Sequence, residues 1–313
     1  MGDVIAIIGA GAWGTALAVH LAGAVSPPAL RLCARDPGMA RSIAGSRENA
    51  RYLPGIVLPP QIEIATDLPR AVAGASLIVV ATPVGALSGV VHALRAHTRA
   101  PLAWLGKGFV AVDAAPGFAL AHRIVAPTWP APVGVISGPS FAEEVARGLP
   151  TAVVVATTAI DFSQALAQRL RNGALRAYVS DDLTGTEVGG AVKNVLAIAA
   201  GASDGLGFGN NARAALITRG LAETARLAIA LGGRHETLTG LSGLGDLVLT
   251  CTGDLSRNRR VGLALARGEP LAAILAGLGH VAEGVLAARA TRALAAALGV
   301  DMPICDAVYR VLY

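Results

Sequence analysis

The sequence over residues 4–22 reads VIAII, then GAGAWG, then TALAVHLA. The apolar run at 4–8 is typical of a buried parallel strand, and the residues from Ala12 onward have helical composition. Between them, Gly9, Gly11 and Gly14 match the pattern G-x-G-x-x-G. In this context the first glycine permits the turn, the second lets the backbone approach a pyrophosphate, and the third allows close helix–strand packing. The stretch therefore predicts a dinucleotide-binding unit.

The end of the next expected strand, at 30–34, bears on which dinucleotide is bound. An NAD-selective site places a carboxylate about twenty residues after the glycines. Here Ala34 and Arg35 occupy that position and Asp36 follows. Arg35 could hold a 2′-phosphate, whereas Asp36 keeps NAD(H) open, although before Pro37 it could simply shape a turn. The sequence is compatible with NAD(H) or NADP(H).

Further apolar runs at 76–81, 102–105, 133–136 and 151–157 alternate with helical stretches. This alternation favours a doubly wound sheet with right-handed crossovers. After about residue 180, alanine, leucine and glycine dominate, and helices are expected at 188–202, 212–231, 263–266, 271–278 and 283–298. We therefore predict an α/β fold in which a Rossmann-like domain over residues 1–180 precedes an all-α domain for substrate binding and catalysis over residues 181–313.

The composition excludes several classes of protein. Hydrophobic residues make up 53% and charged residues 15% of the 313 residues, which excludes a disordered chain. The net charge is +5, the arginines are scattered and aromatics are 4%, which speaks against nucleic-acid binding and suits an anionic small substrate. Residues 4–30 are almost uncharged, but their glycines and the pair Pro27-Pro28 argue against a membrane span.

The cysteines and histidines show no metal-binding spacing. Cys33, Cys251 and Cys305 lie far apart, which is typical of reduced thiols in a cytoplasmic protein. The six histidines also lack the spacing of metal ligands. We therefore expect neither a metal ion nor a catalytic histidine.

Lysine is almost absent from the chain. Of the 26 basic residues only Lys107 and Lys193 are lysines, and the other 24 are arginines. A bias toward arginine explains surface cations, but it does not explain two positions that stay lysine. Lysine is a compact donor with a movable pKa, whereas arginine stays charged. Both lysines are therefore candidate site residues.

Three polar, glycine-rich segments are not required by packing. They are residues 137–144, residues 189–194 around Lys193, and residues 243–246 followed by 256–260, which read SRNRR. A lysine within an apolar helix costs desolvation unless it is paired or functional. Arg257 and Asn258, side by side, supply the charged and neutral donors that a phosphate monoester needs.

Together these segments resemble the bacterial NAD(P)-dependent glycerol-3-phosphate dehydrogenases. The matching pieces follow the family's order from residue 5 to beyond 285: GAGAWGTALA, LGKGF, SGPSFAEEVARGLPTAVVVA, VKNVLAIAAGASDGL, GLSGLGDLVLTCTGDLSRNRRVG and VAEGV. The chain departs from the family at residues 105–106, which are Leu-Gly where the family often has Ala-Thr, beside Lys107. The resemblance implies reversible hydride transfer between sn-glycerol 3-phosphate and dihydroxyacetone phosphate, in a cytoplasmic homodimer that supplies phospholipid synthesis.

The resemblance also implies roles for individual residues. Lys193 would accept the proton in alcohol oxidation, Lys107 would contact substrate and nicotinamide, and Asp246 would bind the substrate or position Lys193. The other substrate contacts would be Gly138, Ser140, Ser256, Arg257 and Asn258. The cofactor contacts would be Ala12, Trp13, Lys107, Ala142, Arg257, Val281 and Glu283, in addition to Gly9, Gly11, Gly14 and Arg35, which the motif and the strand end already indicate.

These roles make a physical prediction about the lysines. The nicotinamide performs the hydride transfer, so the protein must orient it and manage the proton and the charge. Two lysines and Arg257 in one pocket repel each other, which should lower the pKa of at least one lysine toward neutrality. Lysine can use such a shift for proton transfer, whereas arginine cannot.

Several of these residues could instead have purely structural roles. Asp246 and Ser140 could cap helices, Glu283 could be a first-turn acid favoured by the helix dipole, and Trp13 could be a packing residue. A 3-hydroxyacid or ketopantoate-type dehydrogenase also pairs a nucleotide-binding half with a helical half and a lysine. A non-catalytic dinucleotide sensor would bind the cofactor without turnover, but this function leaves Lys193 unexplained.

Overall fold

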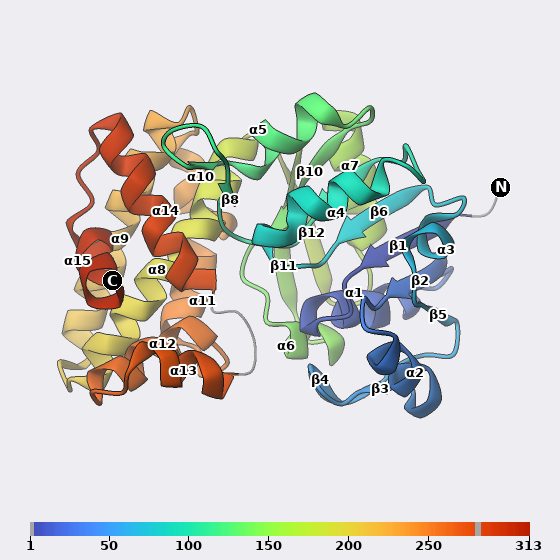
Figure 1. Ribbon diagram of the computed structural model, residues 1–313, viewed down its shortest axis with the longest axis horizontal. Coiled ribbons are helices and arrows are strands. Elements are labelled where there is room, and N and C mark those ends of the chain that lie inside the picture. Colours follow the sequence, from blue (N-terminus) through green and yellow to red (C-terminus); the bar gives the residue numbers. More distant parts are fainter. Residues whose placement is uncertain (1–2, 279–282) are drawn as a thin grey trace. The chain divides into compact units, whose positions relative to one another are not determined.

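The computed structural model of the chain describes residues 3–278 and 283–313 (Figure 1). Its backbone divides into two compact units. The first comprises residues up to Gly106, His122–Ile136 and Ser140–Asp181, and the second comprises Lys107–Ala121, Ser137–Pro139 and Asp182–Tyr313. The segments that carry Lys107 and Gly138 thus belong to the second unit, although they lie in the N-terminal half of the sequence.

The first unit is built on one eight-stranded sheet with helices packed on it (Figure 1). The strands lie in the order β12 (Leu175–Ser180), β11 (Thr151–Thr157), β10 (Val133–Ser137), β7 (Leu102–Trp104), β6 (Leu77–Val80), β1 (Val4–Ile8), β2 (Ala29–Cys33) and β5 (Ile62–Ala65). The pairs β12–β11, β10–β7, β7–β6, β6–β1, β1–β2 and β2–β5 are parallel. The helices of this part of the chain are α1 (Ala12–Ala22), α2 (Pro37–Ser46), α3 (Leu68–Val72), α4 (Leu87–Leu94), α5 (Ala121–Val125), α6 (Ala142–Ala146) and α7 (Ile160–Leu170). A short antiparallel hairpin of β3 (Glu48–Asn49) and β4 (Leu53–Val57) lies apart from the main sheet.

The parallel sheet with flanking helices confirms the predicted α/β fold. Strands β1 and β11 begin and end where the sequence predicts, and β2, β6, β7 and β10 agree within one residue at each end. Strand β1 is buried in the centre because its residues are apolar and it pairs on both sides, with Ile5 opposite Leu30 of β2 and Leu77 of β6. In this part of the chain, strands β3, β4, β5 and β12 and helices α2, α4, α5 and α7 were not predicted individually.

The order of the strands reverses beside β1. Strands β2 and β5 lie on one side of it, whereas β6, β7 and β10 follow on the other. Ligands of doubly wound sheets bind outside the carboxyl ends of the strands at such a switch point. The carboxyl end of β1 leads directly into the turn that begins at Gly9, so the topology places the glycine motif at the expected binding position.

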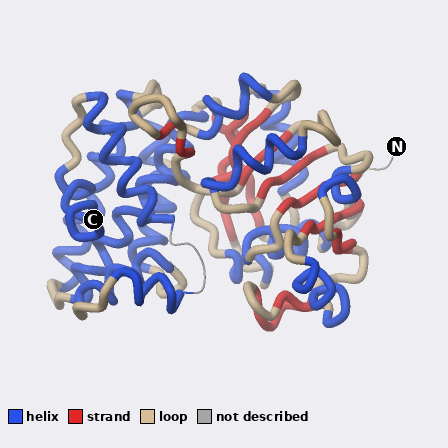
Figure 2. The backbone as a smooth tube through the Cα atoms, viewed as in Figure 1, coloured by secondary structure: helices blue, strands red, loops and turns tan. Residues whose placement is uncertain are grey.

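The second unit is helical, as Figure 2 shows by colour. Its helices are α8 (Leu183–Gly205), α9 (Gly209–Ala230), α10 (His235–Thr239), α11 (Asp246–Thr252), α12 (Arg257–Ala266), α13 (Leu271–Leu278), α14 (Glu283–Leu298) and α15 (Pro303–Leu312), with a π-helical turn at Leu241–Gly245 and a small hairpin of β8 (Val110–Ala111) and β9 (Phe118–Ala119). Helices α8 and α12 are longer than predicted, and α10, α11 and α15 were not predicted.

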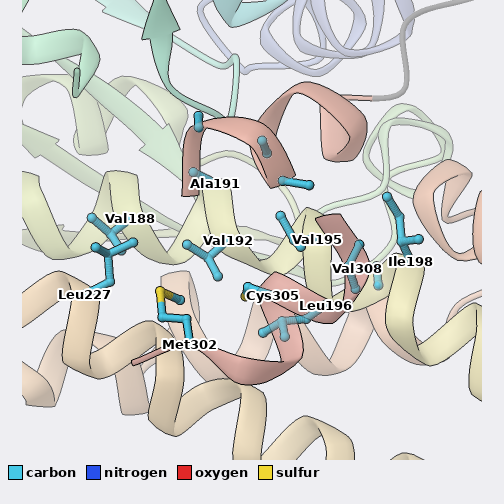
Figure 3. Packing of buried hydrophobic residues seen from close by; sticks show 14 of the residues in the cluster. Val188, Ala191, Val192, Val195, Leu196, Ile198, Leu227, Met302, Cys305 and Val308 are labelled. Atoms are coloured by element: carbon cyan, nitrogen blue, oxygen red, sulfur yellow. The ribbon is translucent and has the colours of Figure 1, made fainter. Parts of the chain in front are cut away.

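Helix α8 is the centre of this unit, and α9, α11, α12 and α14 pack around it. Figure 3 shows Val192 and Leu196 of α8 among Leu227 of α9, Met302 and Cys305. A helix that is apolar on nearly all sides is stable only when it is buried. The same burial surrounds the single lysine of this helix. In the described part of the chain, no helix combines the length and the apolar character needed to cross a membrane.

Candidate functional site

The two lysines of the chain meet at one buried carboxylate in the second unit. Lys107 is the first residue of the segment 107–121, Lys193 lies in the middle of α8, and Asp246 is the first residue of α11. The Lys193 Nζ donates to Asp246 Oδ1 and the Lys107 Nζ donates to Asp246 Oδ2, both at 2.6 Å. The Asp246 side chain is 1% exposed, against 9% for Lys193 and 14% for Lys107. Each oxygen of the carboxylate therefore holds one ammonium group.

The Lys193 ammonium has a second acceptor in Thr250, one helical turn beyond Asp246. The Lys193 Nζ donates to Thr250 Oγ1 at 2.8 Å, and the Thr250 hydroxyl donates to the Asp246 backbone carbonyl at 2.6 Å. Burial lowers the pKa of Lys193 to about 8, although Asp246 acts to raise it, and Lys107 adds to the lowering. The direction agrees with the sequence prediction, but burial rather than repulsion between cations is the largest cause. A group with a pKa near neutrality can both donate and accept a proton.

Lys107 is held by further backbone and amide contacts. Its Nζ donates to the Gly138 carbonyl at 2.9 Å, and its own carbonyl accepts from Asn194 Nδ2 at 3.2 Å. Asn258 Nδ2 in turn donates to Asn194 Oδ1 at 2.9 Å, and Asn258 Oδ1 accepts from the Gly284 N–H at 3.1 Å. This chain of amides connects the Lys107 loop, α8, α12 and the start of α14 within the second unit.

The residues expected to hold a phosphate lie at the start of α12. Ser256 is the N-cap of this helix, and its Oγ accepts from the Arg259 N–H at 3.2 Å. Arg257, the first helical residue, is exposed, whereas the Asn258 side chain is buried. The N–H groups and the dipole of a helix N-terminus favour an anion. An exposed guanidinium beside such a terminus suits a phosphate.

The glycine turn of the first unit fits a dinucleotide. Gly9 has a φ of 116°, and a Cβ on Gly14 would lie 2.0 Å from the Gly9 carbonyl oxygen, so turn geometry and packing require both glycines. At Gly11, by contrast, a Cβ would meet no heavy atom of the described chain within 4 Å, apart from those of Gly11 and its two neighbours in the sequence. The missing side chain of Gly11 therefore leaves open space at the backbone, which is what the close approach of a pyrophosphate needs.

Ala12 and Trp13 are the first residues of α1. The N–H groups of a first helical turn have no partner within the helix and can face phosphates. The Trp13 indole Nε1 donates to the Ser140 carbonyl at 2.9 Å, so this side chain makes a specific contact in addition to packing. Phe141 holds the N-cap position of α6, and Ser140 directly precedes it. Ala142 is the first residue of α6.

The two side chains that bear on cofactor choice lie directly after β2. Asp36 is the N-cap of α2, and its Oδ1 accepts from the Gly38 N–H at 2.8 Å, with Pro37 in the first turn. The Asp36 carboxylate thus serves a helix N-terminus, which agrees with a structural use. Arg35 is exposed. An exposed guanidinium at this position is compatible with a 2′-phosphate, and the Asp36 Oδ1 bond leaves NAD(H) equally compatible.

Val281 and Glu283 are the remaining candidates for the cofactor site. Val281 lies outside the described residues. Glu283 is the first residue of α14, and its charge acts to raise the pKa of Lys193. Sequence reasoning missed Thr250 and Asn194 as members of the cluster. Their spacing carries a signal, because Thr250 lies four residues after Asp246 and Asn194 directly follows the catalytic candidate Lys193.

Comparison with known proteins gives a consistent result over nearly the whole chain. Residues 4–163 match the model of the NAD-dependent glycerol-3-phosphate dehydrogenase N-terminus, and residues 182–313 match that of the C-terminus. A glycerol-3-phosphate dehydrogenase [NAD(P)+] from Variovorax paradoxus is 57% identical over 98% of this chain and 92% of its own length. The crystal structure of a glycerol-3-phosphate dehydrogenase from Coxiella burnetii superposes with a TM-score of 0.93 at 42% identity, covering 100% of this chain and 95% of that one.

The ketopantoate alternative finds support in the fold alone. A ketopantoate reductase from Ralstonia eutropha superposes with a TM-score of 0.58 at 16% identity, covering 99% of this chain and 97% of that one. Such a likeness shows a shared architecture and no shared substrate.

Proposed function

The chain belongs to the family of NAD-dependent glycerol-3-phosphate dehydrogenases, and on that premise we propose that it interconverts sn-glycerol 3-phosphate and dihydroxyacetone phosphate with a nicotinamide dinucleotide. In this chain the main support for the proposal is a buried cluster in which the Asp246 carboxylate accepts hydrogen bonds from both Lys193 and Lys107. A dinucleotide sensor without turnover has no need of a buried lysine with a pKa of about 8. The residue roles below are part of the proposal.

The dinucleotide is held by the turn and first helical residues that follow β1. When it is bound, the nicotinamide ring donates or takes up the hydride. Gly9 and Gly14 shape the turn, and Gly11 leaves room for the pyrophosphate. The other residues that we assign to the cofactor are Ala12, Trp13, Arg35, Lys107, Ala142, Arg257, Glu283 and Val281, the last of which lies outside the described residues.

Lys193 transfers the proton. In the oxidative direction its neutral amine accepts the proton of the substrate's C2 hydroxyl, and in the reductive direction its ammonium returns a proton to the C2 oxygen. Asp246 and Thr250 accept hydrogen bonds from the same Nζ and so fix where its remaining donor or lone pair can point. Asp246 is therefore both a counter-ion for the charged form and a guide for the amine.

The second lysine manages the negative charge that develops on the substrate. This charge grows on the C2 oxygen during reduction, and a fixed cation near that oxygen lowers the barrier. We assign this task to Lys107, whose ammonium is oriented by Asp246 and the Gly138 carbonyl.

The substrate phosphate binds at Ser256, Arg257 and Asn258. Arg257 supplies charge and the α12 N-terminus supplies a favourable dipole. Among the described residues the Ser256 Oγ accepts from the Arg259 N–H, so its own proton is available to donate to the phosphate. Gly138 and Ser140 are assigned to contacts with the rest of the substrate.

Three broader assignments complete the proposal, the first from the change in composition near residue 180 and the others mainly from the family resemblance. We propose that residues 1–180 bind the dinucleotide and residues 181–313 the substrate, that the enzyme is a homodimer, and that it works in the cytoplasm in the reductive direction, supplying phospholipid synthesis. Sedimentation equilibrium at several protein concentrations tests the homodimer, and a single species with the monomer mass would contradict it.

The test of the activity is the loss of reduced-nicotinamide absorbance on adding dihydroxyacetone phosphate, with NADH and NADPH run in parallel. We expect turnover in the wild type and a loss of about 10²–10⁴-fold in kcat for Lys193→Met, which removes the titrating amine but keeps most of the side chain. Lys193→Arg is the matched control, because it restores a cation that cannot release its proton. Both variants should still bind NADH, and substantial turnover by Lys193→Arg would refute proton transfer by this residue.

A further inference from the structure

The glycine turn has a partner from a distant part of the first unit. Asn49, in β3, is 1% exposed and lies 39 residues beyond the turn in sequence. Its Nδ2 donates to the Ala10 carbonyl at 2.9 Å and to Thr15 Oγ1 at 2.8 Å. Ala10 is the residue between the first two glycines of the motif, and Thr15 lies in the first turns of α1. One amide group therefore clamps the turn to the helix that it starts.

The Asn49 side chain is itself fixed in place. Its Oδ1 accepts from the Tyr52 N–H at 3.3 Å, and the Asn49 backbone pairs with Leu53 in the β3–β4 hairpin. Both amide protons and the amide oxygen thus have partners within the hairpin, the turn or α1. Because the Asn49 side chain is fixed by three hydrogen bonds, it holds the Ala10 carbonyl in one orientation.

The Ala10 carbonyl is the group whose direction matters for binding. A trans peptide unit is planar, so its C=O and the next N–H point in opposite directions. By fixing the Ala10 carbonyl, Asn49 fixes the direction of the Gly11 N–H, which points away from the hairpin. Of the three glycines of the motif, Gly11 is the one at which a Cβ would meet no described atom within 4 Å beyond its own residue and its chain neighbours. The oriented N–H and the open space therefore coincide at one residue.

We propose that Asn49 is a positioning residue for the dinucleotide, acting through the Ala10 carbonyl to preset the backbone N–H groups that receive the pyrophosphate. The inference rests on the proposed use of a nicotinamide dinucleotide and assigns a task to the β3–β4 hairpin. Without the clamp the Ala10–Gly11 peptide can rotate, and binding must then include the cost of ordering it.

The chain contains a matched control for this role. Asn172 Nδ2 donates to the His20 carbonyl at 2.9 Å, near the C-terminal end of the same helix. Asn172→Ala removes an amide-to-carbonyl hydrogen bond onto α1, as Asn49→Ala does, but far from the turn. A loss that arises only from destabilising α1 should be similar in the two variants.

The experiment measures dissociation constants for NADH and for ADP by calorimetry, together with kcat, the KM for dihydroxyacetone phosphate and the melting temperature. For Asn49→Ala we expect the Kd of NADH and of ADP to rise by about tenfold or more, because a buried carbonyl loses its partner. The kcat at saturating NADH should stay within about threefold, because the reacting groups lie elsewhere. Asn172→Ala should leave both Kd values unchanged.

A second substitution at the same position tests the role in case Asn49→Ala does not fold. Asn49→Asp keeps the shape but places an acceptor against the Ala10 carbonyl, so it should weaken NADH at least as much as Asn49→Ala. Unchanged Kd values in a folded Asn49 variant, or an equal loss in Asn172→Ala, would overturn the positioning role while leaving the proposed function intact. Failure of the wild type to bind both NADH and NADPH would overturn the proposed function and this inference together.

Discussion

The charges around Lys193 make a prediction in which two substitutions shift the same pKa in opposite directions. In the proposed mechanism the neutral amine of Lys193 accepts a proton, so kcat/KM for oxidation of sn-glycerol 3-phosphate should rise with pH through a midpoint at about 8. Asp246 acts to raise this pKa and Lys107 acts to lower it. Asp246→Asn should therefore move the midpoint to lower pH, and Lys107→Met should move it to higher pH.

The distances set the size of each shift. Opposite charges 2.6 Å apart attract by roughly 6 kcal/mol at an effective dielectric constant of about 20, which is an upper bound for the effect of Asp246 on Lys193. An opposite charge at close range shifts a pKa by about 1–3 units in practice, so the oxidative midpoint of Asp246→Asn should fall to about pH 5–7. Lys107 has a smaller influence than Asp246, and its removal should raise the midpoint by less than about one unit.

The assay is the initial rate of nicotinamide reduction, measured from about pH 6.5 to about pH 10 at fixed ionic strength, with the reverse reaction as a check. The second ionisation of a phosphate monoester lies near pH 6, below most of this range. In the wild type the oxidative rate should rise between about pH 7 and pH 9, and the reductive rate should fall over the same interval because the ammonium is the donor. In Asp246→Asn this rise should be nearly absent, whatever the absolute rate.

Two results would refute the reasoning. A midpoint that stays at about 8 in both variants would mean that the titrating group is not Lys193. A shift of both midpoints in the same direction would mean that the substitutions act through distortion of the cluster and not through charge. Thr250→Val is the neutral control, because it removes a hydrogen bond to the same Nζ and changes no charge.

Three further substitutions test other parts of the molecule. Arg35→Ala should raise the KM for NADPH by about tenfold or more and the KM for NADH by less than about threefold, because only NADPH carries a 2′-phosphate; an equal effect on both would contradict this recognition. At saturating cofactor, which offsets any loss of the cofactor contact assigned to the same residue, Arg257→Ala should raise the KM for dihydroxyacetone phosphate by about tenfold or more and leave kcat/KM for unphosphorylated dihydroxyacetone unchanged; equal losses for both substrates would remove Arg257 from the phosphate site. Glu223→Ala should lower the free energy of unfolding by about 2 kcal/mol in urea titrations. The buried Glu223 carboxylate accepts hydrogen bonds from the N–H groups of Ile304 and Cys305, in the first turn of α15, at 2.8 and 3.1 Å. An unchanged free energy of unfolding would show that this capping interaction contributes little.

The main sheet could be predicted because its signals are local. An apolar run that ends at a glycine marks a buried strand without reference to any other part of the chain. Helix α2 was missed although its signal is also local, since Asp36 followed by Pro37 is a common helix start but is equally compatible with a loop. Strand β12 is harder, because Arg176 and Tyr178 alternate with buried residues at the edge of the sheet, where one face stays polar.

The candidate site could be predicted residue by residue but not as an arrangement. The composition singled out Lys107 and Lys193, and the resemblance added Asp246. Their convergence on one carboxylate depends on where α8 and α11 pack, which no spacing in the sequence gives. Asn49 carried no signal at all, because its role depends on a two-residue strand that reaches the glycine turn only in the folded unit.

The retention of lysine has a different cause at each of the two positions. At Lys193 the cause is burial. Desolvation within the central helix of the second unit lowers the pKa of the ammonium more than repulsion by Lys107 does, and the result is a pKa of about 8. A guanidinium would stay charged in the same place. At Lys107 the side chain must place one compact ammonium between the Gly138 carbonyl and the second oxygen of Asp246, at 2.9 and 2.6 Å. The planar fork of an arginine spreads its charge over a wider group and would not fit that position while Lys193 holds the other oxygen. A genome that replaces lysine by arginine wherever charge alone is required would therefore keep these two lysines. Lys193 is kept because its ammonium can release a proton, and Lys107 is kept because its ammonium is small.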